Sequence, residues 1–400
     1  MKSLEEQLQL IKRGVVDFVT QNELEQKIKN SIQKNKPLIV KLGIDPNSSD
    51  IHLGHTVALN KLRQFQDLGH KVILIIGDYT AMIGDPSGRM TERPQLDHGT
   101  ILKNVATYQE QAYKILDKDK VEIVFNGGWF EKLNFRDIIK LISKFTLAQM
   151  LEHDYFDKRF KKGLPLSIHE LLYPMMQGYD SVMIKADIEL GGTDQRFNVI
   201  AGRYLQKEFG QESQVGLFTP ILTGLDGKNK MSKSLNNYIG VNNKPEDMYG
   251  KVMSMPDKLI IQYFELVTDV GLEEISNFEK SMKEGTNPKD IKKRLAFEIV
   301  KKFHSIDAAK TAETQFSKVF SGREDPENIE EFRVPEDKLS IVKLLTSTKL
   351  AKSNSEAQRL IKQGGVYIDK ERVDDFKKEI IIKEPFILKV GKRKYLKIIQ

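Results

Sequence analysis

The stretch DPNSSDIHLGHT, residues 45–56, places two histidines three positions apart, after an apolar run and before a helical pattern. His52 and His55 at this spacing share one face of a helix. Such a pair could be half of a zinc site, an acid–base pair or part of a packed surface. Because the chain has no cysteine and its seven histidines are scattered, we expect no zinc site and assign no metal ligand.

A lysine-rich segment, GLDGKNKMSKS at residues 224–234, follows a predicted strand. The chain has no GxxxxGK[ST] phosphate-binding loop, so a nucleotide would need another means of binding. Lysines on a flexible loop can close over a triphosphate and neutralise the charge that develops on a leaving pyrophosphate. Taken alone, however, the segment is more typical of a solvated lysine-rich loop.

Alternating strands and helices would position both segments. Apolar runs at residues 37–45 and 71–78 predict buried strands, and the series continues at residues 121–126, 184–190 and 216–222. A helix between the first two strands is predicted to end at Gly69, with one apolar face formed by Ala58, Leu62, Phe65 and Leu68. The pattern predicts an α/β fold, a Rossmann-like doubly wound parallel sheet, which binds ligands at the carboxyl ends of its strands.

The chain is expected to contain further modules after this sheet. We place a catalytic domain with an insertion at residues 1–240, a helical domain at 241–325 and an acidic, proline-containing linker at 326–336. A small α+β module is expected at residues 337–400. In it, Ser353 and Glu356 predict a capping box, and three short alternating segments predict strands.

Charge and hydropathy limit the class of protein. The longest clean apolar run, residues 72–76, is far shorter than the ~20 residues that span a bilayer, and the first residues lack the apolar segment of a signal peptide. We therefore expect a cytoplasmic protein that does not insert into membranes. Residues 336–400 contain 16 lysines and arginines against 9 acidic residues, which accounts for the whole net charge of +7. A polyanionic partner and a solvated charged surface explain this tail about equally well.

The two segments together are more informative than either alone. HLGH and KMSKS, in this order on an α/β pattern, resemble the nucleotide-binding motifs of class I aminoacyl-tRNA synthetases. The resemblance implies that His52 and His55 bind ATP phosphates at a helix N-terminus and that Gly54 leaves room for adenine. It also implies that Lys230 and Lys233 are catalytic and that ATP is bound by Asp45, Gly192, Asp194, Met231, Ser232 and Ser234.

Three further segments, residues 77–89, 172–180 and 189–198, look like the amino-acid-binding segments of bacterial tyrosyl-tRNA synthetases. Tyr173, Gln177 and Asp180 are spaced to project from one face of a helix. By resemblance, Asp85, Tyr173 and Gln177 hold the ammonium of tyrosine, Asp180 accepts its phenol, and Gln195 lies near its carboxylate. Lys41 stands where the better-known bacterial pattern has a tyrosine in contact with the phenol, so we assign Lys41 to the same substrate end.

The resemblance implies activation of tyrosine with ATP, accompanied by Mg²⁺, and transfer of tyrosine to tRNA(Tyr) by a homodimer. Residues 241–325 would then be the anticodon-binding domain and residues 337–400 an S4-like RNA-binding domain. Three alternatives remain open. They are a tryptophanyl-tRNA synthetase, a small-molecule adenylyltransferase and a catalytically silent RNA-binding protein.

Overall fold

The structure is a computed structural model that describes residues 2–46, 50–87, 98–320, 329–369, 371–382, 384–391 and 394–400. The chain divides into two compact units, Met1–Glu313 and Thr314–Gln400. No helix in the described part of the chain is long and apolar enough to cross a membrane.

A six-stranded sheet forms the centre of the first unit. Its strand order is β1-β6-β5-β2-β3-β4, and every neighbouring pair is parallel except the edge pair β1 and β6. Strand β3 is buried along nearly its whole length, as expected for a sheet covered on both faces. The strands are β1 Asp17–Val19, β2 Ile39–Ile44, β3 Lys71–Ile76, β4 Val121–Phe125, β5 Ile188–Gly192 and β6 Val215–Thr219. The predicted doubly wound parallel sheet is confirmed.

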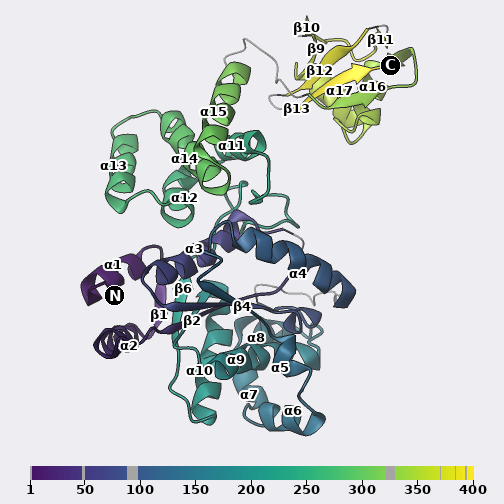
Figure 1. The fold of residues 1–400 in the computed structure, drawn as a ribbon. Coiled ribbons are helices and arrows are strands. Elements are labelled where there is room, and N and C mark those ends of the chain that lie inside the picture. Colours follow the sequence, from purple (N-terminus) through teal and green to yellow (C-terminus); the bar gives the residue numbers. More distant parts are fainter. Residues whose placement is uncertain are drawn as a thin grey trace. The chain divides into compact units, whose positions relative to one another are not determined.

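Helices cover both faces of this sheet. Helix α3 (Leu53–Asp67) lies on one face, and α9 (Tyr173–Ile184) and α10 (Arg196–Glu208) lie on the other (Figure 1). Helices α9 and α10 approach closely, because a Cβ atom at Gly178 would lie 3.0 Å from the Cα atom of Gly202. This contact fixes α9 against its neighbour and thereby fixes the position of the residues that α9 carries.

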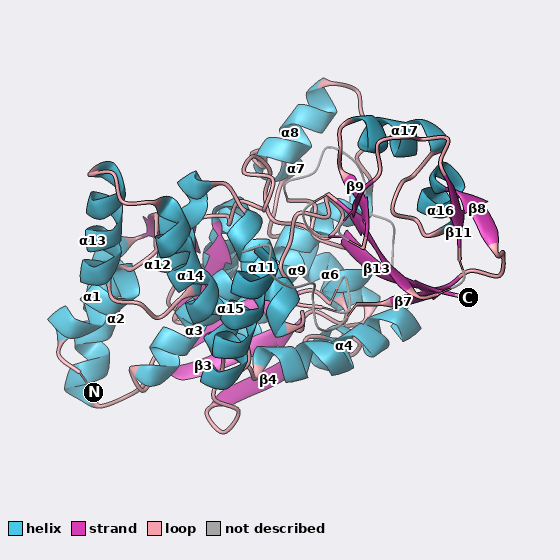
Figure 2. Ribbon diagram, turned by 90° about the horizontal axis from the view of Figure 1, so that it is seen from above, coloured by secondary structure: helices cyan, strands magenta, loops and turns pink. Residues whose placement is uncertain are grey.

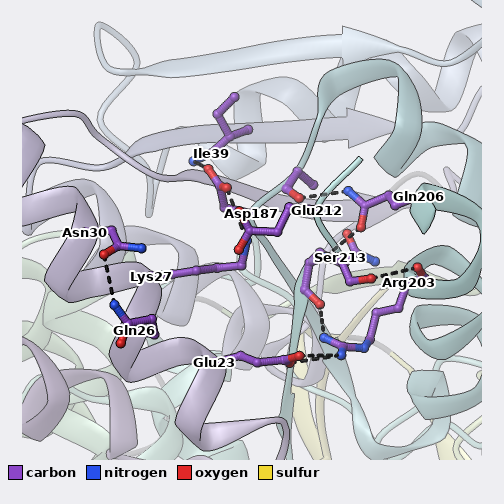
Figure 3. Close-up of polar contacts among 12 residues, drawn as sticks. Glu23, Gln26, Lys27, Asn30, Ile39, Asp187, Arg203, Gln206, Glu212 and Ser213 are labelled. Atoms are coloured by element: carbon purple, nitrogen blue, oxygen red, sulfur yellow. Dashed lines mark hydrogen bonds and ion pairs between the residues drawn. The ribbon is translucent and has the colours of Figure 1, made fainter. Parts of the chain in front are cut away.

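The N-terminal segment packs along the edge strand β6 and, through α2, against the amino ends of the strands. It consists of α1 (Leu4–Lys12), β1 and α2 (Gln21–Lys34). The Lys27 ammonium of α2 forms ion pairs with Glu212 at 2.9 Å and Asp187 at 3.6 Å, and Asp187 also accepts the backbone N–H of Ile39 (Figure 3). Arg203 joins the same segment by donating to Glu23 and to the backbone carbonyl of Val19. Strand β1 was not predicted from the sequence.

An insertion separates β4 from α9, and a helical region follows β6. The insertion contains α5 Gly127–Phe130, α6 Phe135–Ile142, α7 Leu147–Met150, α8 Asp154–Lys161 and the 3₁₀ helix η2 Ile168–Leu172. Helix α4 (His98–Ala112) precedes β4, and η1 (Thr80–Met82) follows β3. The helical region groups together as Figure 2 shows, and contains α11 Pro245–Ser254, η4 Asp257–Leu259, α12 Ile260–Val267, α13 Leu272–Lys283, α14 Pro288–Phe303 and α15 Ile306–Phe320.

The second unit has a hydrophobic core of its own, to which Leu344, Ile361 and Leu388 contribute. It contains a five-stranded sheet with the order β10-β9-β12-β13-β7, a two-stranded sheet of β11 and β8, and two helices. Its elements are β7 Glu331–Arg333, β8 Lys338–Ser340, α16 Ile341–Ser347, α17 Asn354–Lys362, β9 Val366–Ile368, β10 Glu371–Arg372, β11 Glu379–Ile381, β12 Phe386–Val390 and β13 Lys394–Ile399.

Three local expectations need correction. Residues 331–333, assigned to a linker, form strand β7, which pairs in parallel with β13. The strand expected at 184–190 begins only at Ile188, because Ile184 still belongs to α9 and Lys185 ends that helix in the left-handed region at φ 53°. The Glu356 carboxylate accepts the backbone N–H of Lys352, not that of Ser353, so only the serine half of the capping box forms.

Candidate active site

A cavity of about 330 Å³ lies at the carboxyl ends of the parallel strands. Its wall includes Asp45 after β2, Gly77 after β3 and Asn126 after β4, as the doubly wound fold predicts. Fourteen of the residues proposed from the sequence line it: Asp45, His52, Gly54, His55, Asp85, Tyr173, Gln177, Asp180, Gly192, Asp194, Gln195, Lys230, Met231 and Ser232. Lys41, Lys233 and Ser234 are not part of this lining.

The two histidines begin helix α3. Their rings stack with centroids 3.9 Å apart, and His52 is the N-cap residue. Nδ1 of His52 accepts the N–H of Gly54, and Nδ1 of His55 accepts the N–H of His52. Since both Nδ1 atoms are acceptors, each neutral ring carries its proton on Nε2 and offers a donor there.

Electrostatics keep this pair neutral. Burial, then the neighbouring His55 and Lys233, hold the pKa of His52 far below its usual value. Burial, then Lys233, lowers the pKa of His55 to about 4. At neutral pH the helix terminus therefore presents uncharged N–H donors, which together with the helix dipole suit an anionic ligand.

Gly54 has a steric reason to be glycine. A Cβ atom at this position would lie 2.9 Å from Cε1 of the His52 ring, closer than a side chain tolerates without movement of that ring. The chain beyond the lysine loop also supports this turn, since the N–H of Leu53 donates to Ile239 and that of Val241 to Ile51. The histidine segment is thus joined by backbone hydrogen bonds to the chain that directly follows the lysine loop.

The lysine loop holds its two proposed catalytic lysines differently. Lys230 is exposed and lines the cavity. Lys233 forms an ion pair with Asp50 at 2.6 Å, beside the histidine segment, and its ammonium lies 5.9 Å from the ring centre of Tyr238. Ser234 contacts the hydroxyl of Ser232 at 2.9 Å. Asp50 and Tyr238 were not singled out from the sequence.

Hydrogen bonds connect the polar residues at the other end of the cavity. The hydroxyl of Tyr173 donates to Asp45 at 2.9 Å, and Thr80 donates to the second oxygen of the same carboxylate at 2.8 Å. The Gln195 amide donates to Asp85 at 2.6 Å. Both carboxylates are therefore held in place by hydrogen bonds from neutral donors.

Asp180 is the deepest of these carboxylates. It is 4% exposed, and it accepts hydrogen bonds from the indole of Trp129 at 3.0 Å and the amide of Asn126 at 3.3 Å. Burial raises the pKa of Asp180 to about 7, while Lys41 and these two donors act in the opposite direction. Trp129 and Asn126 were not singled out from the sequence, although NGGW begins at the last residue of a predicted strand and contains the chain's single tryptophan.

Lys41 lies behind the cavity wall. Its side chain is fully buried and pairs at 3.0 Å with Glu189, which is its register neighbour on β5. The ammonium also donates to the carbonyl of Gln177 and to the hydroxyl of Ser181, each at 2.8 Å. The three protons of the ammonium thus have three acceptors within the protein.

Comparison with known proteins agrees with this geometry. Residues 33–321 match the family described as tRNA synthetases class I (W and Y), and residues 323–398 match the tyrosine–tRNA ligase SYY-like C-terminal domain. A tyrosine–tRNA ligase of Carboxydothermus hydrogenoformans is 54% identical over 99% of this chain and 98% of its own length. One from Thermotoga maritima is 53% identical over 98% of this chain and 97% of its own length.

Solved structures share the fold. A C-terminally truncated mitochondrial tyrosyl-tRNA synthetase of Aspergillus nidulans superposes with a TM-score of 0.66, at 22% identity, over 80% of this chain and 95% of that chain. The Archaeoglobus fulgidus enzyme, crystallised with L-tyrosine, gives a TM-score of 0.63 at 23% identity, over 78% of this chain and all of that chain. The tryptophanyl and RNA-binding alternatives gain no support from these relatives. With a family match over most of its length and full-length relatives about half identical to it, the chain belongs to the class I tRNA synthetases, among the tyrosine–tRNA ligases.

Proposed function

We propose that the cavity joins tyrosine to tRNA(Tyr) in two steps. The carboxylate of tyrosine attacks the α-phosphate of ATP, which forms tyrosyl-adenylate and releases pyrophosphate. A hydroxyl of the terminal adenosine of the tRNA then attacks the adenylate carbonyl and releases AMP. The observation that carries this proposal is a single cavity with a carboxylate- and amide-rich end and a histidine- and lysine-bearing end.

The amino-acid end suits a zwitterion with a phenol. Asp85, Tyr173 and Gln177 would receive the ammonium, and Gln195 would lie near the carboxylate. Asp180 would accept the phenolic hydroxyl, because a buried carboxylate that is left unpaired penalises a substrate without that hydroxyl. No enzyme nucleophile is needed, since the substrate carboxylate attacks, so this end of the cavity contributes positioning.

The nucleotide end suits a triphosphate. The Nε2–H groups of His52 and His55 would donate to phosphate oxygens, and Lys230 and Lys233 would neutralise charge on the departing pyrophosphate. Gly54 would lie against the adenine, and Asp194 would reach the ribose hydroxyls. Asp45, Gly192, Met231, Ser232 and Ser234 complete the proposed ATP contacts.

Magnesium would arrive with ATP. Among the described residues, no group of three histidine, cysteine or acidic side chains is placed to hold a metal ion. Mg²⁺ commonly keeps several waters and binds substrate phosphates, so its ligands here would be phosphate oxygens. No step is assigned to the metal.

The proposed tRNA partner and the proposed homodimer are inferred from charged and apolar side chains on the protein surface. The basic excess of residues 336–400 fits a tRNA backbone, and a cytoplasmic location would follow from that substrate.

A homodimer is proposed from the insertion between β4 and α9. Four of its apolar side chains are 60–81% exposed and would be covered by a second copy: Phe135, Leu147, Phe160 and Ile168. Light scattering of the wild type and of Phe160→Asp tests this, and a wild-type mass of one chain would contradict it.

Pyrophosphate exchange with each of the twenty amino acids, with and without tRNA, tests the proposed reaction. Exchange that depends on tyrosine and needs no tRNA is expected. In Asp180→Asn the ratio of kcat/KM for tyrosine over phenylalanine should fall, because the anionic acceptor is gone. Exchange with another amino acid, or none with any, would overturn the assignment. Discrimination of roughly 10⁵-fold between tyrosine and phenylalanine, which a tyrosyl-tRNA synthetase can reach without editing, is the scale against which that ratio is judged.

A further inference from the structure

Behind the amino-acid end of the cavity lies a closed polar network. Lys41 and Glu189 are 0% and 1% exposed, and they extend from neighbouring strands toward helix α9. Glu189 accepts from the Gln177 amide at 3.0 Å and from the Ser181 hydroxyl at 3.1 Å, and also from the Gln214 amide. A buried ion pair stabilises little unless such bonds satisfy it fully, and here each charge is saturated.

The network contacts helix α9 at Gln177, one of its proposed substrate residues, and at Ser181, which follows Asp180. The Gln177 amide gives a hydrogen to Glu189, so its N–H₂ group points toward the sheet and its carbonyl oxygen is left for the cavity that Gln177 lines. Lys41 bonds to the backbone of Gln177 and to Ser181, the residues three before and one after Asp180 on the same helix. The positive charge of Lys41 therefore lies behind the part of α9 that carries Asp180, and it favours the ionised form of that carboxylate.

We propose that the buried Lys41–Glu189 pair is a positioning device for amino-acid recognition: Glu189 turns the Gln177 oxygen toward the substrate ammonium, and Lys41 maintains Asp180 as an anionic acceptor for the substrate hydroxyl. Neither residue touches the substrate. The inference rests on the proposed function of the cavity and deepens it, since it replaces the direct phenol contact first assigned to Lys41.

The groups that face Asp180 define the test. Lys41 comes from β2 and Glu189 from β5, and the two act on Asp180 with opposite sign. Asn126 and Trp129 donate hydrogen bonds to it, and η1 contributes the uncharged Thr80. Among the described residues, further charged groups on the surrounding elements are the cavity carboxylates Asp45 and Asp85, Asp78, which accepts the N–H of Gly127, and, on η2, Glu170, which is paired with Arg159. Helix α10 packs against α9 through Gly202.

The experiment measures pyrophosphate exchange with tyrosine and with phenylalanine between pH 5.5 and 9. Steps that involve ATP affect the kcat/KM values of both substrates alike. The ratio of the two values therefore reports how well the enzyme recognises the phenolic hydroxyl. Because burial raises the pKa of Asp180 to about 7, the wild-type ratio should fall as the pH drops through that value. Lys41→Met should move this fall to higher pH by about one unit or more and lower the ratio about tenfold at pH 7.5.

Glu189→Gln should behave differently. Its kcat/KM should fall by about tenfold or more for both substrates, because both carry the ammonium that Gln177 meets. The midpoint of its ratio should move to lower pH, since a negative charge beside Asp180 is gone. The double variant Lys41→Met/Glu189→Gln restores the charge balance, and it can be measured if a single variant does not fold. Its midpoint should return toward the wild-type value.

Lys61→Met is the matched control. Lys61 is also a buried lysine, 3% exposed, but it donates to the backbone carbonyl of Ile11 from α3 on the opposite face of the sheet. Its loss should lower Tm without moving the midpoint. A midpoint that equals the wild-type value in Lys41→Met or, if that variant does not fold, in Glu189→Gln would overturn the inference. Absence of tyrosine-dependent exchange in the wild type would instead overturn the proposed function.

Discussion

Lys230 and Lys233 belong to one loop but have different partners, because Lys230 lines the cavity and Lys233 pairs with Asp50. Both charges should act on the pyrophosphate as it leaves and contribute little to tyrosine binding. We therefore expect Lys230→Ala and Lys233→Ala each to slow adenylate formation by about 10²–10³-fold, with the Kd for tyrosine nearly unchanged. Rapid-quench kinetics and equilibrium dialysis measure the two quantities.

Lys228→Ala is the control for this prediction. Lys228 is exposed on the same loop and outside the cavity lining, and its contact with Asp226 is made by its backbone N–H. Its activation rate should equal that of the wild type. An equal loss in all three variants would mean that the loop acts through its general charge, and no loss in any would remove the proposed role of KMSKS.

At this scale, a linear motif identifies residues but not their partners. His52, His55 and the trio on α9 could be placed from spacing alone, because a helix brings such positions to one face. The role of Lys41 could not, since its partner Glu189 is far away in the chain and meets it only through the register of β2 and β5. Trp129 is likewise distant in sequence from Asp180, and the fold of the insertion brings the two side chains together.

Among the elements, α9 depends on its close contact with α10. Gly178→Ala would place a Cβ atom 3.0 Å from the backbone of Gly202, so the helices must separate, and overpacking of this kind costs about 1–3 kcal/mol. Because α9 carries Tyr173, Gln177 and Asp180, the KM for tyrosine should rise in the same variant. Denaturant unfolding and exchange kinetics measure both effects.

Gly250→Ala provides the comparison for this variant. Gly250 lies within α11, and a Cβ atom there would meet nothing within 4 Å. The substitution should stabilise the protein by about 0.5–1 kcal/mol, the helix-propensity difference, with KM unchanged. If Gly178→Ala were as stable as Gly250→Ala, the close approach of α9 and α10 would not constrain the site.

His70 links α1 to the sheet and makes stability depend on pH. Its Nδ1 accepts the N–H of Leu38, its Nε2 lies 3.0 Å from Oε1 of Gln7, and burial lowers its pKa to about 4. Below about pH 6.5 the unfolded chain binds a proton that the folded protein does not. The free energy of unfolding therefore decreases as the pH is lowered, by up to about 3 kcal/mol near pH 4.

His70→Gln should flatten this dependence. Urea unfolding at pH 7 and pH 5 compares the two proteins, and the variant should lose less stability between them than the wild type does. His52 and His55 remain in the variant and keep part of the slope, because their pKa values are lowered as well. Equal slopes would show that His70 does not resist protonation in the folded state.

The central strands β2 and β3 could be predicted because both are mostly apolar, as strands of a sheet covered on both faces must be. Strand β1 was not, since its three residues, Asp17–Val19, carry no distinct pattern and are strand only through pairing with β6. The start of β5 was placed too early because the apolar residues at the end of α9 continue the same run. In both cases the ends of the strand depend on pairing with distant segments, which a local hydrophobic pattern does not reveal.

At the scale of the whole molecule, the proposed catalytic and RNA-binding tasks lie in different units. Every residue that lines the cavity falls within residues 42–232. The excess positive charge falls within residues 336–400, and most of that segment belongs to a core of its own. A cut near Val334 would remove β13, the partner of β7, and leave β7 unpaired, so the separation is better tested by ending the chain at Phe320, the last residue of α15.

The shortened chain should make tyrosyl-adenylate at close to the full-length rate, because it keeps the sheet, the cavity and α11 to α15. Its affinity for tRNA should fall, and its binding should depend less on salt, since each lost phosphate contact removes about 0.7–0.9 from the slope of log K against log salt. Titration of labelled tRNA at several salt concentrations, with pyrophosphate exchange and circular dichroism on the same samples, measures all three properties. A folded but inactive shortened chain would place the second unit in the catalytic machinery. Unchanged affinity and slope would show that its positive charge is a solvated surface that does not meet tRNA.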